Sequence, residues 1–242
     1  MTRLDQLLVE RGDFQSREKA RRTIMAGRVK VDGRVSDKPG TSVGAEAAVE
    51  VSAPESPYVS RGGLKLVRAL DHFALDVKDL VCLDIGASTG GFTDCLLQRG
   101  ARRVYAVDVG YGQLDFGLRQ DARVVVMERV NARHLETEDL PELCDFATFD
   151  VSFISLGKVV PAATALVRTG GRLVTLIKPQ FEVGKGRVGK GGVVRDKELR
   201  LQVIAERIEE LEGYGLDCVG WIDSPITGAR GNLEALAVFT KT

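Results

Sequence analysis

The stretch from Val81 to Phe92, VCLDIGASTGGF, places the strongest constraint on the fold of this chain. A short apolar run ends at Asp84 and is followed at once by a turn rich in Gly, Ser and Thr. Helix-like sequence then continues to Arg99, and Gly100 stands where a helix would stop. A strand, a tight turn and a helix in this order open a doubly wound α/β sheet, whose ligands bind beyond the carboxyl ends of its strands. The stretch therefore predicts both a fold class and the place of a binding site.

The residues of this turn exclude two common nucleotide-binding motifs. No Gly-Lys-Ser/Thr follows, so a P-loop lysine is missing, and Ser88 stands where GxGxxG requires its second glycine. The pattern Asp-x-Gly-x-x-x-Gly-Gly resembles instead the first motif of S-adenosylmethionine (SAM) methyltransferases, although a glycine turn of another α/β protein is the alternative. The resemblance implies SAM as the cofactor. Its predicted contacts in this stretch are Asp84, Gly86, Ser88, Thr89, Gly90, Gly91 and Phe92.

The chain beyond residue 80 alternates strand-like and helix-like segments. Short apolar runs at 81–85, 104–107, 124–127, 146–149 and 173–177 predict the strands of a buried parallel sheet. Helices are expected at 154–168 and, after a cap at Asp196, to about Glu212. Two successive strands, 215–222 and 233–240, end the chain. We predict a Rossmann-like α/β sheet of the methyltransferase type with an antiparallel C-terminal strand pair.

Residues 1–51 are predicted to form a separate α+β module. Two short helices precede a hairpin with an Asp32-Gly33 turn. Between residues 11 and 38, nine Lys/Arg stand against four Asp/Glu, a net charge of +5, whereas the whole chain has a formal net charge of 0. A solvated helix face is the plain explanation, but basic residues on both helices and on the hairpin favour a surface for RNA phosphates. The residues predicted for it are Arg3, Arg17, Lys19, Arg21, Arg22, Arg28 and Lys30.

This module also resembles the small RNA-binding module of a ribosomal small-subunit protein, of pseudouridine synthases and of tyrosyl-tRNA synthetases. The resemblance is carried by RLDQLLVERG, SREKARRTIMAGRVKVDG and DKPG, which together span nearly the whole module. Residues 52–63 contain two prolines and two glycines and are predicted to be a linker. Residues 64–242 are then predicted to be the methyltransferase domain.

Polar residues end several of the predicted strands. Asp108 ends the second strand, where an acid accepts hydrogen bonds from the ribose hydroxyls of an adenosine cofactor, and Asn131 follows the third, within reach of adenine or ribose. Asp150 and Lys178 end the fourth and fifth strands. All of these meet the glycine turn at one edge of the sheet, and Asp150 is counted among the cofactor contacts as well. Because charged groups that end buried strands need partners or a site, this convergence predicts an active site.

Four motifs together resemble the FtsJ-like 2′-O-ribose methyltransferases, and more closely the TlyA-type rRNA cytidine-2′-O-methyltransferases, which are also labelled hemolysin A. SRGGLKL contains Lys65, FDVSFISL contains Asp150, LIKPQFE contains Lys178 and GNLEAL contains Glu234. With the basic module in front, the resemblance covers essentially the full length. It implies a catalytic Lys-Asp-Lys-Glu set and ribosomal RNA or ribosomal subunits as the partner.

The Lys-Asp-Lys-Glu set has to position and activate a ribose hydroxyl. A ribose 2′-hydroxyl is a very weak acid, so it must be held in line with the SAM methyl group while its proton is removed or shared. A lysine accepts a proton only when neutral, and the positive charges of Lys65 and of the sulfonium favour a neutral Lys178. Lys65 can alternatively stabilise the developing alkoxide. Which lysine takes the proton stays open at this level. In the glycine-rich loop after Lys178, the residues predicted to grip RNA phosphates are Lys185, Arg187 and Lys190.

Composition disfavours several rival functions. The chain is 44% hydrophobic and 28% charged, as in ordinary soluble proteins. No signal-peptide pattern and no apolar run near the ~20 residues of a membrane span is present, so we expect a cytoplasmic protein and not a membrane-active hemolysin. The missing GxGxxG argues against an NAD-dependent dehydrogenase, and the polar strand ends argue against a non-catalytic ribosome-binding factor. His72 and His134 are too isolated to predict a metal site.

Overall fold

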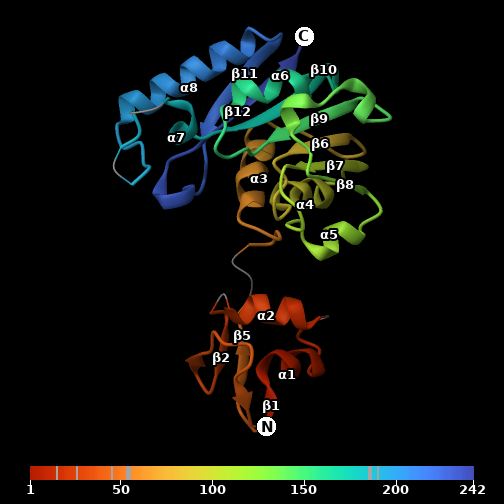
Figure 1. Cartoon of the computed structure of the whole chain (residues 1–242), viewed down its shortest axis with the longest axis vertical. Helices are drawn as coiled ribbons and strands as arrows, with labels where there is room; N and C mark the ends of the chain where they lie inside the picture. The colour runs from red at the N-terminus through yellow and green to blue at the C-terminus, as the bar shows by residue number, and fades with distance from the viewer. Residues whose placement is uncertain (15, 26, 45, 53–55, 185–186, 190) are drawn as a thin grey trace. The chain divides into compact units, whose positions relative to one another are not determined.

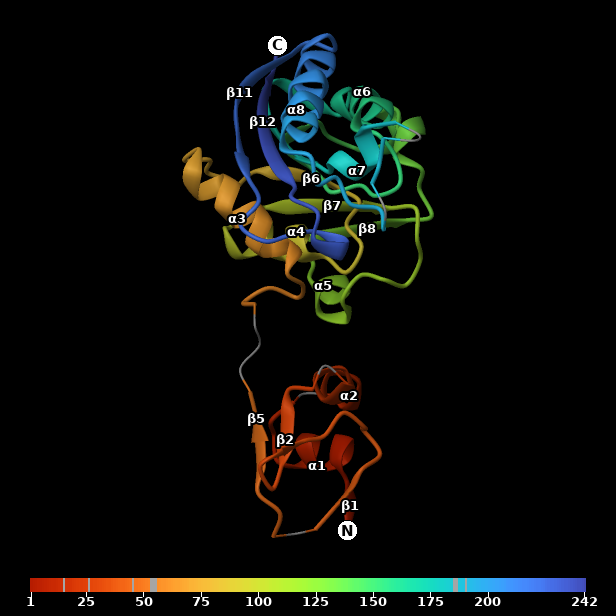
Figure 2. The same cartoon turned by 90° about the vertical axis from the view of Figure 1, so that its left-hand side faces the viewer.

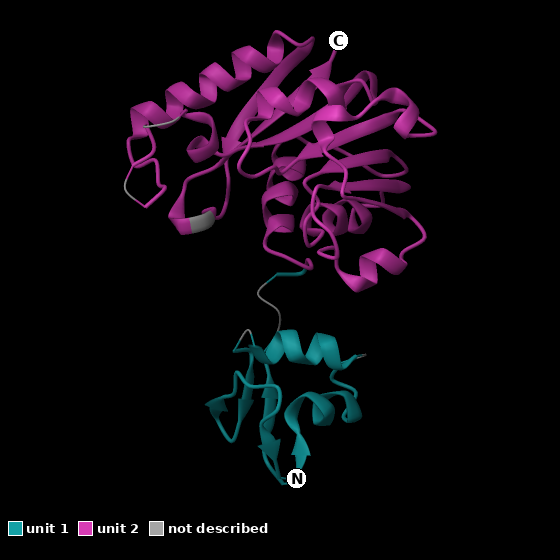
Figure 3. Cartoon of the chain, viewed as in Figure 1, with its two compact units in different colours: residues 1–57 teal, residues 58–242 magenta. Residues whose placement is uncertain are grey.

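The computed structural model describes residues 1–14, 16–25, 27–44, 46–52, 56–184, 187–189 and 191–242. It divides the chain into two compact units, residues 1–57 and 58–242 (Figure 3). The division falls inside the stretch predicted to be a linker. Residues 58–63 belong to the second unit, in which the Tyr58 ring lies so close to Gly63 that a Cβ at this glycine would clash with it.

The first unit packs two helices against short strands. Its elements are β1 (Thr2–Arg3), α1 (Leu4–Glu10), α2 (Arg17–Met25), β2 (Val29–Val31), β3 (Arg34–Val35), β4 (Ser42–Val43) and β5 (Val49–Val51). The strands form an antiparallel β1–β4 pair and a sheet in the order β3-β2-β5. The predicted hairpin is confirmed, because β2 and β3 pair antiparallel across Asp32 (φ 50°) and Gly33 (φ 75°), the positive φ angles that a two-residue hairpin turn requires. Leu4, Leu8 and Ile24 form the centre of a small core.

The second unit is built around a seven-stranded sheet (Figures 1 and 2). Its strands are β6 (Val81–Ile85), β7 (Arg103–Asp108), β8 (Val124–Glu128), β9 (Cys144–Phe149), β10 (Val167–Ile177), β11 (Leu216–Asp223) and β12 (Ala235–Lys241). They lie in the order β11-β12-β10-β9-β6-β7-β8. The five strands from β6 to β10 are parallel, and β12 runs antiparallel between β10 and β11. The predicted mixed sheet with an antiparallel C-terminal pair is therefore confirmed.

Helices cover both faces of this sheet. Along β6, Val81, Leu83 and Ile85 point into a core shared with α6 (Val160–Thr164) and α8 (Lys197–Glu212). Cys82 points the other way, into a core shared with α3 (Gly62–His72), α4 (Gly91–Gln98) and α5 (Phe116–Gln120). Figure 1 shows α6 and α8 on one side of the strands and α3 and α4 on the other. Because alternate residues of one strand face opposite layers, both faces of this strand are buried, and it is apolar except for Asp84.

Two helix predictions have different outcomes. Asp196 caps α8 as predicted, since its carboxylate accepts the backbone N–H groups of Glu198 and Leu199. The helix predicted over 154–168 is wrong in extent: the chain forms the 3-10 turn η3 (Leu156–Lys158) and the short α6, and β10 already begins at Val167. Pro161 cannot donate a helix hydrogen bond and clashes with the preceding turn, so it limits α6 to a start after η3.

The remaining elements are short. They are the 3-10 turns η1 (Ala132–His134), η2 (Thr137–Asp139) and η4 (Ala229–Gly231), and the helix α7 (Pro179–Glu182). Within the part of the chain that is described, no helix combines the length and apolar character needed to cross a bilayer.

Candidate active site

Two adjoining cavities open beyond the carboxyl ends of the parallel strands. The larger has a volume of about 590 Å³ and the smaller about 390 Å³. Gly86, Ser88, Asp150, Ser152 and Phe153 line both, so the loops after β6 and β9 form the wall between them. The predicted edge of the sheet thus holds a two-chambered site.

The larger cavity has the chemistry that an adenosine moiety needs. Asp108 ends β7, and its carboxylate accepts the backbone N–H of Ser88 at 2.8 Å and that of Gly110 at 2.7 Å. Each oxygen keeps a lone pair for a ribose hydroxyl. Asn131 lines the same cavity, where its side chain caps η1 by accepting the Arg133 N–H at 3.2 Å. Apolar side chains make up much of the remaining wall, including Val107, Val109, Val130, Val151 and Ile154. The residues present therefore fit SAM, and Asp108 and Asn131, the residues predicted to contact its ribose and adenine, both line this cavity.

Some of the predicted residues of the glycine turn line the cavities, and others hold the turn in place from behind. Gly86, Ser88, Thr89, Gly91 and Phe92 are all wall residues. Gly86 has φ +83°, and a Cβ there would lie 2.6 Å from the Asp150 carbonyl oxygen, so only glycine permits this approach of the two loops.

Asp84 and Gly90 lie behind the turn and line neither cavity. The Asp84 carboxylate is fully buried and accepts the hydroxyls of Thr93 at 2.6 Å and Thr148 at 2.8 Å. Burial raises the pKa of this carboxyl to about 6. Gly90 has φ +98°, and a Cβ there would strike the side chains of Leu114 and Leu118. Both residues hold the turn against its neighbours.

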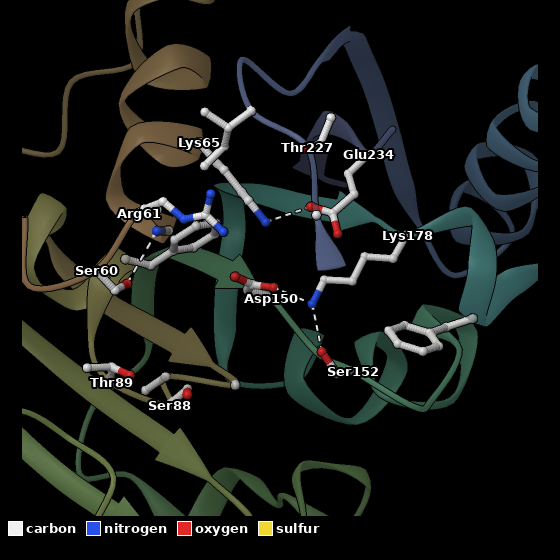
Figure 4. Close-up of a pocket in the computed structure, with 18 of the residues that line it drawn as sticks. Ser60, Arg61, Lys65, Ser88, Thr89, Asp150, Ser152, Lys178, Thr227 and Glu234 are labelled. Atoms are coloured by element: carbon white, nitrogen blue, oxygen red, sulfur yellow. Dashed lines mark hydrogen bonds and ion pairs between the residues drawn. The ribbon is translucent and has the colours of Figure 1, made fainter. Parts of the chain in front are cut away.

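The smaller cavity brings together all four residues of the predicted catalytic set (Figure 4). Lys65 on α3 lies 2.6 Å from Glu234, measured from Nζ to Oε2. Lys178, directly after β10, lies 2.5 Å from Asp150 (Nζ to Oδ1) and donates to the Ser152 hydroxyl at 2.9 Å. The set is therefore assembled as two lysine–carboxylate pairs.

Strand register explains why residues so distant in sequence meet. Asp150 and Lys178 follow the adjacent parallel strands β9 and β10. Glu234 precedes β12, which runs antiparallel to β10 with Ala235 opposite Ile177. The first residue before β12 therefore lies beside the first residue after β10. Gly228 completes the arrangement, because a Cβ at this position would collide with the Glu234 carboxylate.

These charges are withdrawn from water. Lys65 is 9% exposed, Lys178 7% and Glu234 3%. Each buried ammonium group faces one carboxylate, so the formal charges of the two pairs cancel, while Arg61 adds an exposed cation to the same cavity. Desolvation makes such pairs poor contributors to stability, whereas fixed charges in a dry site are effective at orienting a reacting group.

Several wall residues were not predicted from the sequence, and Ser152 and Phe153 stand out among them. Ser152 hydrogen-bonds Lys178. Phe153 is 90% exposed at the cavity mouth, adopts φ +64°, and its ring lies 5.0 Å from that of Phe181 at 48°. The position of FDVSFIS at the end of a predicted strand was the signal that could have found these two residues. Both residues stand within this motif, which was used only for Asp150.

The residues predicted to bind RNA are mostly exposed. On α2 these are Arg17, Lys19, Arg21 and Arg22; Lys30 on β2 is exposed as well, and Arg28 is half-buried. Arg3 and Arg17 share one partner, the fully buried Asp5 of α1, which lies 3.1 Å from Arg3 and 3.0 Å from Arg17. Arg187 is exposed, whereas Lys185 and Lys190 lie outside the described residues.

Known proteins resemble both units. Residues 58–241 match the family described as FtsJ-like methyltransferase, and residues 2–49 match the S4 domain. The 16S/23S rRNA (cytidine-2′-O)-methyltransferase TlyA of Mycobacterium tuberculosis is 49% identical over 236 residues, which cover 96% of this chain and 87% of that protein. A solved structure from Streptococcus thermophilus, described as a candidate hemolysin, is 45% identical with a TM-score of 0.78, covering 100% of this chain and 88% of that chain.

The fold also extends to distant enzymes. An S-adenosylmethionine-dependent methyltransferase from Mesorhizobium loti superposes with a TM-score of 0.52 at 15% identity, over 72% of this chain and 96% of that chain. The predictions of a methyltransferase fold, of a methyltransferase enzyme and of SAM as its cofactor are confirmed. The chain belongs to the FtsJ-like methyltransferase family.

Proposed function

We propose that this protein transfers a methyl group from SAM to the 2′-hydroxyl of a cytidine ribose in ribosomal RNA. The observation that carries the proposal is the placement of Lys178, with Asp150 and Ser152, on the wall beside the cavity that fits SAM. The name of the Mycobacterium tuberculosis relative supports ribosomal RNA and cytidine as the substrate. Bound SAM supplies an electrophilic methyl group on a sulfonium centre.

The surroundings of Lys178 limit what its amine does. Two of the directions around Nζ are taken by Asp150 at 2.5 Å and by Ser152 at 2.9 Å. The remaining direction is open to a substrate oxygen. When Nζ is charged, an N–H there orients the ribose hydroxyl; when it is neutral, a lone pair there accepts the hydroxyl proton. In either state Asp150 and Ser152 fix the amine.

Lys65 and Glu234 form the opposite side of the smaller cavity. Glu234 holds the Lys65 ammonium at 2.6 Å in a buried setting, so this cation is ready to face an oxygen on which negative charge develops. We assign proton handling or hydroxyl orientation to Lys178, and stabilisation of the alkoxide to Lys65. The two carboxylates keep their amines in place.

The first unit is proposed to capture the RNA. Its arginines and lysines are exposed apart from the half-buried Arg28, and Asp5 holds Arg3 and Arg17 together while both side chains keep about half their surface in water, at 51% and 55%. Guanidinium groups presented in this way suit phosphate oxygens. The proposed RNA-binding module spans residues 1–51, and the methyltransferase domain comprises the predicted 64–242 together with residues 58–63, which pack in the same unit.

Transfer of labelled methyl groups tests the function directly. The protein is incubated with labelled SAM and either free rRNA or isolated ribosomal subunits, and the RNA is digested to nucleosides for mass spectrometry. We expect label on the ribose of cytidine. Label on a base would reject the ribose mechanism, and label on the ribose of another nucleoside would reject the cytidine assignment alone.

A further inference from the structure

We propose that Glu182 is a positioning residue for Lys178: its carboxylate ties the turn that carries Lys178 to the loop that carries Asp150 and Ser152. The inference rests on the proposed function, in which Lys178 acts at the chemical step. Glu182 ends the LIKPQFE motif, four residues after Lys178, and it does not line either cavity.

Two chain segments form the Lys178 side of the site. One is 150–156 after β9, and the other is 178–182 after β10. Their first residues are fixed because they directly follow neighbouring strands, and the Asp150 N–H also donates to the Ile85 carbonyl at 2.9 Å. Beyond this point neither segment continues in the sheet. The distance between Lys178 and its partners therefore depends on what joins the segments farther along.

Glu182 makes that connection at the far end. One carboxylate oxygen, Oε1, accepts the Leu156 N–H at 3.0 Å. Between this bond and Lys178, the rings of Phe153 and Phe181 pack at 5.0 Å. Three contacts therefore join the two segments: the Lys178 interactions at their start, the ring contact in the middle and the Glu182 hydrogen bond at their end. Only the Glu182 bond uses a side chain that does not line a cavity.

A second interaction anchors Glu182 itself. Its Oε2 lies 3.0 Å from Nε of Arg207 on α8, as an ion pair whose alignment is not that of a hydrogen bond. The Glu182 side chain is 2% exposed and that of Arg207 13%. Arg207 also pairs with Glu210, whose carboxylate fills the space where Gly157 would carry a Cβ. The long helix α8 therefore reaches both segments through one charge network, in which Glu182 and Arg207 are buried and Glu210 is 39% exposed.

A purely stabilising role is the competing explanation. Buried ion pairs are weak contributors to stability because desolvation opposes their attraction. Glu142 offers a matched control: it accepts from Arg103 at 2.8 Å and from the Tyr105 hydroxyl at 3.3 Å, at the start of β7 and so at the opposite edge of the sheet. The Glu142 side chain is 29% exposed, and a variant there loses a carboxylate that is bonded to an arginine and to a second donor far from Lys178.

The experiment compares Glu182→Ala, Glu182→Gln and Glu142→Ala in the full chain. We expect Glu182→Ala to lower kcat for methyl transfer to rRNA by about 10²-fold, the scale of a misplacement of about 1 Å, with SAM and RNA affinities within about threefold of wild type. Glu182→Gln keeps an acceptor for the Leu156 N–H and should recover most of this loss. Glu142→Ala should leave kcat unchanged. Amide hydrogen exchange in 150–157 should accelerate in Glu182→Ala and not in Glu142→Ala.

Combination with Lys178→Ala separates positioning from general damage. If Glu182 acts through Lys178, the double variant should transfer methyl groups as slowly as Lys178→Ala alone. Additive losses, a kcat for Glu182→Ala within threefold of wild type, or equal losses in Glu142→Ala would each overturn the inference. A wild-type protein that transfers no methyl group to RNA ribose would overturn the proposed function itself, and with it the role given to Glu182.

Discussion

The two units of this protein arrange their charged residues in opposite ways. In the first unit the acid is buried and the bases are exposed: Asp5 has no accessible side-chain surface, while Arg3 and Arg17 are 51% and 55% exposed. In the second unit both lysine side chains are buried, Lys65 at 11% and Lys178 at 9%, and each faces one acid, Glu234 at 2% and Asp150 at 22%. A shared buried acid leaves two cations facing outward for a ligand that brings negative charge. One acid per buried lysine leaves no net charge and fixes the amines for chemistry.

This difference in exposure separates the proposed RNA-binding surface of the first unit from the proposed catalytic residues of the second. Arginines with about half their surface in water stay partly hydrated, so a phosphate displaces water and counterions at small cost. The buried lysine–carboxylate pairs lose hydration when the protein folds. Because their mutual attraction does not exceed this desolvation cost, they add little to the free energy of unfolding. Four measurements can test this separation.

The largest effect is expected at Lys178. Lys178→Ala should reduce kcat for methyl transfer by about 10³- to 10⁴-fold while SAM and RNA affinities change little, as for an interaction used mainly in the transition state. Lys178→Arg should not restore activity, because a guanidinium stays protonated and does not reproduce a compact amine between Asp150 and Ser152. Single-turnover transfer with labelled SAM measures both. Near-normal turnover in Lys178→Ala would discard the assignment.

Stability should respond next to the loss of one buried partner. Lys65→Met leaves the Glu234 carboxylate buried without its ammonium and should lower the free energy of unfolding by about 3 kcal/mol, whereas Lys65→Met with Glu234→Gln should recover much of that loss. Arg3→Met should cost less than about 1 kcal/mol, since Asp5 keeps Arg17. Urea unfolding monitored by circular dichroism measures all three. Equal costs at the two sites would show that burial does not distinguish them.

Parts of this site could be predicted from sequence because they depend on local pattern. Asp108, Asp150 and Lys178 each end an apolar strand, and parallel strands bring such ends to one edge. Lys65 and Glu234 were predicted only through the family resemblance. Their meeting depends on β12 inserting between β10 and β11, a long-range pairing that no local pattern encodes.

Other features escaped prediction because burial of a polar group depends on distant partners. Asp5 looks like an ordinary acid in the first turn of a helix, and Glu182 looks like an acid at the start of a loop. Asp5 pairs with Arg17 of α2, and Glu182 pairs with Arg207 of α8, so each acid has its partner on another element. Gly90 was predicted to contact the cofactor, yet its missing Cβ makes room for leucine side chains. A bulky residue at this position would therefore test the fold of the turn and not SAM binding alone.

Salt dependence should separate the two units. Arg21→Gln with Lys30→Gln removes two exposed cations of the first unit, and we expect RNA affinity near physiological salt to fall about tenfold. The slope of log affinity against log salt should become shallower by roughly 0.7 to 0.9 for each phosphate that the variant no longer neutralises. Lys158→Gln with Lys197→Gln removes two exposed cations of the second unit and is the matched control. Equal slopes in both double variants would contradict RNA capture by the first unit.

The smallest effect is expected for Asp5→Asn, and its sign is the informative quantity. Removing a negative charge from an RNA-binding surface should tighten binding if charge alone mattered, so Asp37→Asn, at an exposed acid of the same unit, should leave affinity equal or slightly higher. Asp5→Asn should instead weaken binding by about fivefold, or about 1 kcal/mol, because an amide cannot hold both Arg3 and Arg17 as the carboxylate does, and both side chains become free to spread.

The Arg3 hydrogen bond, and then Arg17, hold the pKa of the Asp5 carboxyl below its ordinary value. The folded state therefore releases this proton more readily than the unfolded chain. The resulting stability is present above the unfolded value near 3.8 and is lost only as the pH falls through the lower folded value. The difference between wild type and Asp5→Asn in RNA affinity should accordingly be constant from pH 5 to pH 8, as measured by fluorescence anisotropy with labelled rRNA fragments. Tighter binding by Asp5→Asn would show that the buried acid only opposes RNA, and the contrast between the two units would then reduce to exposure alone.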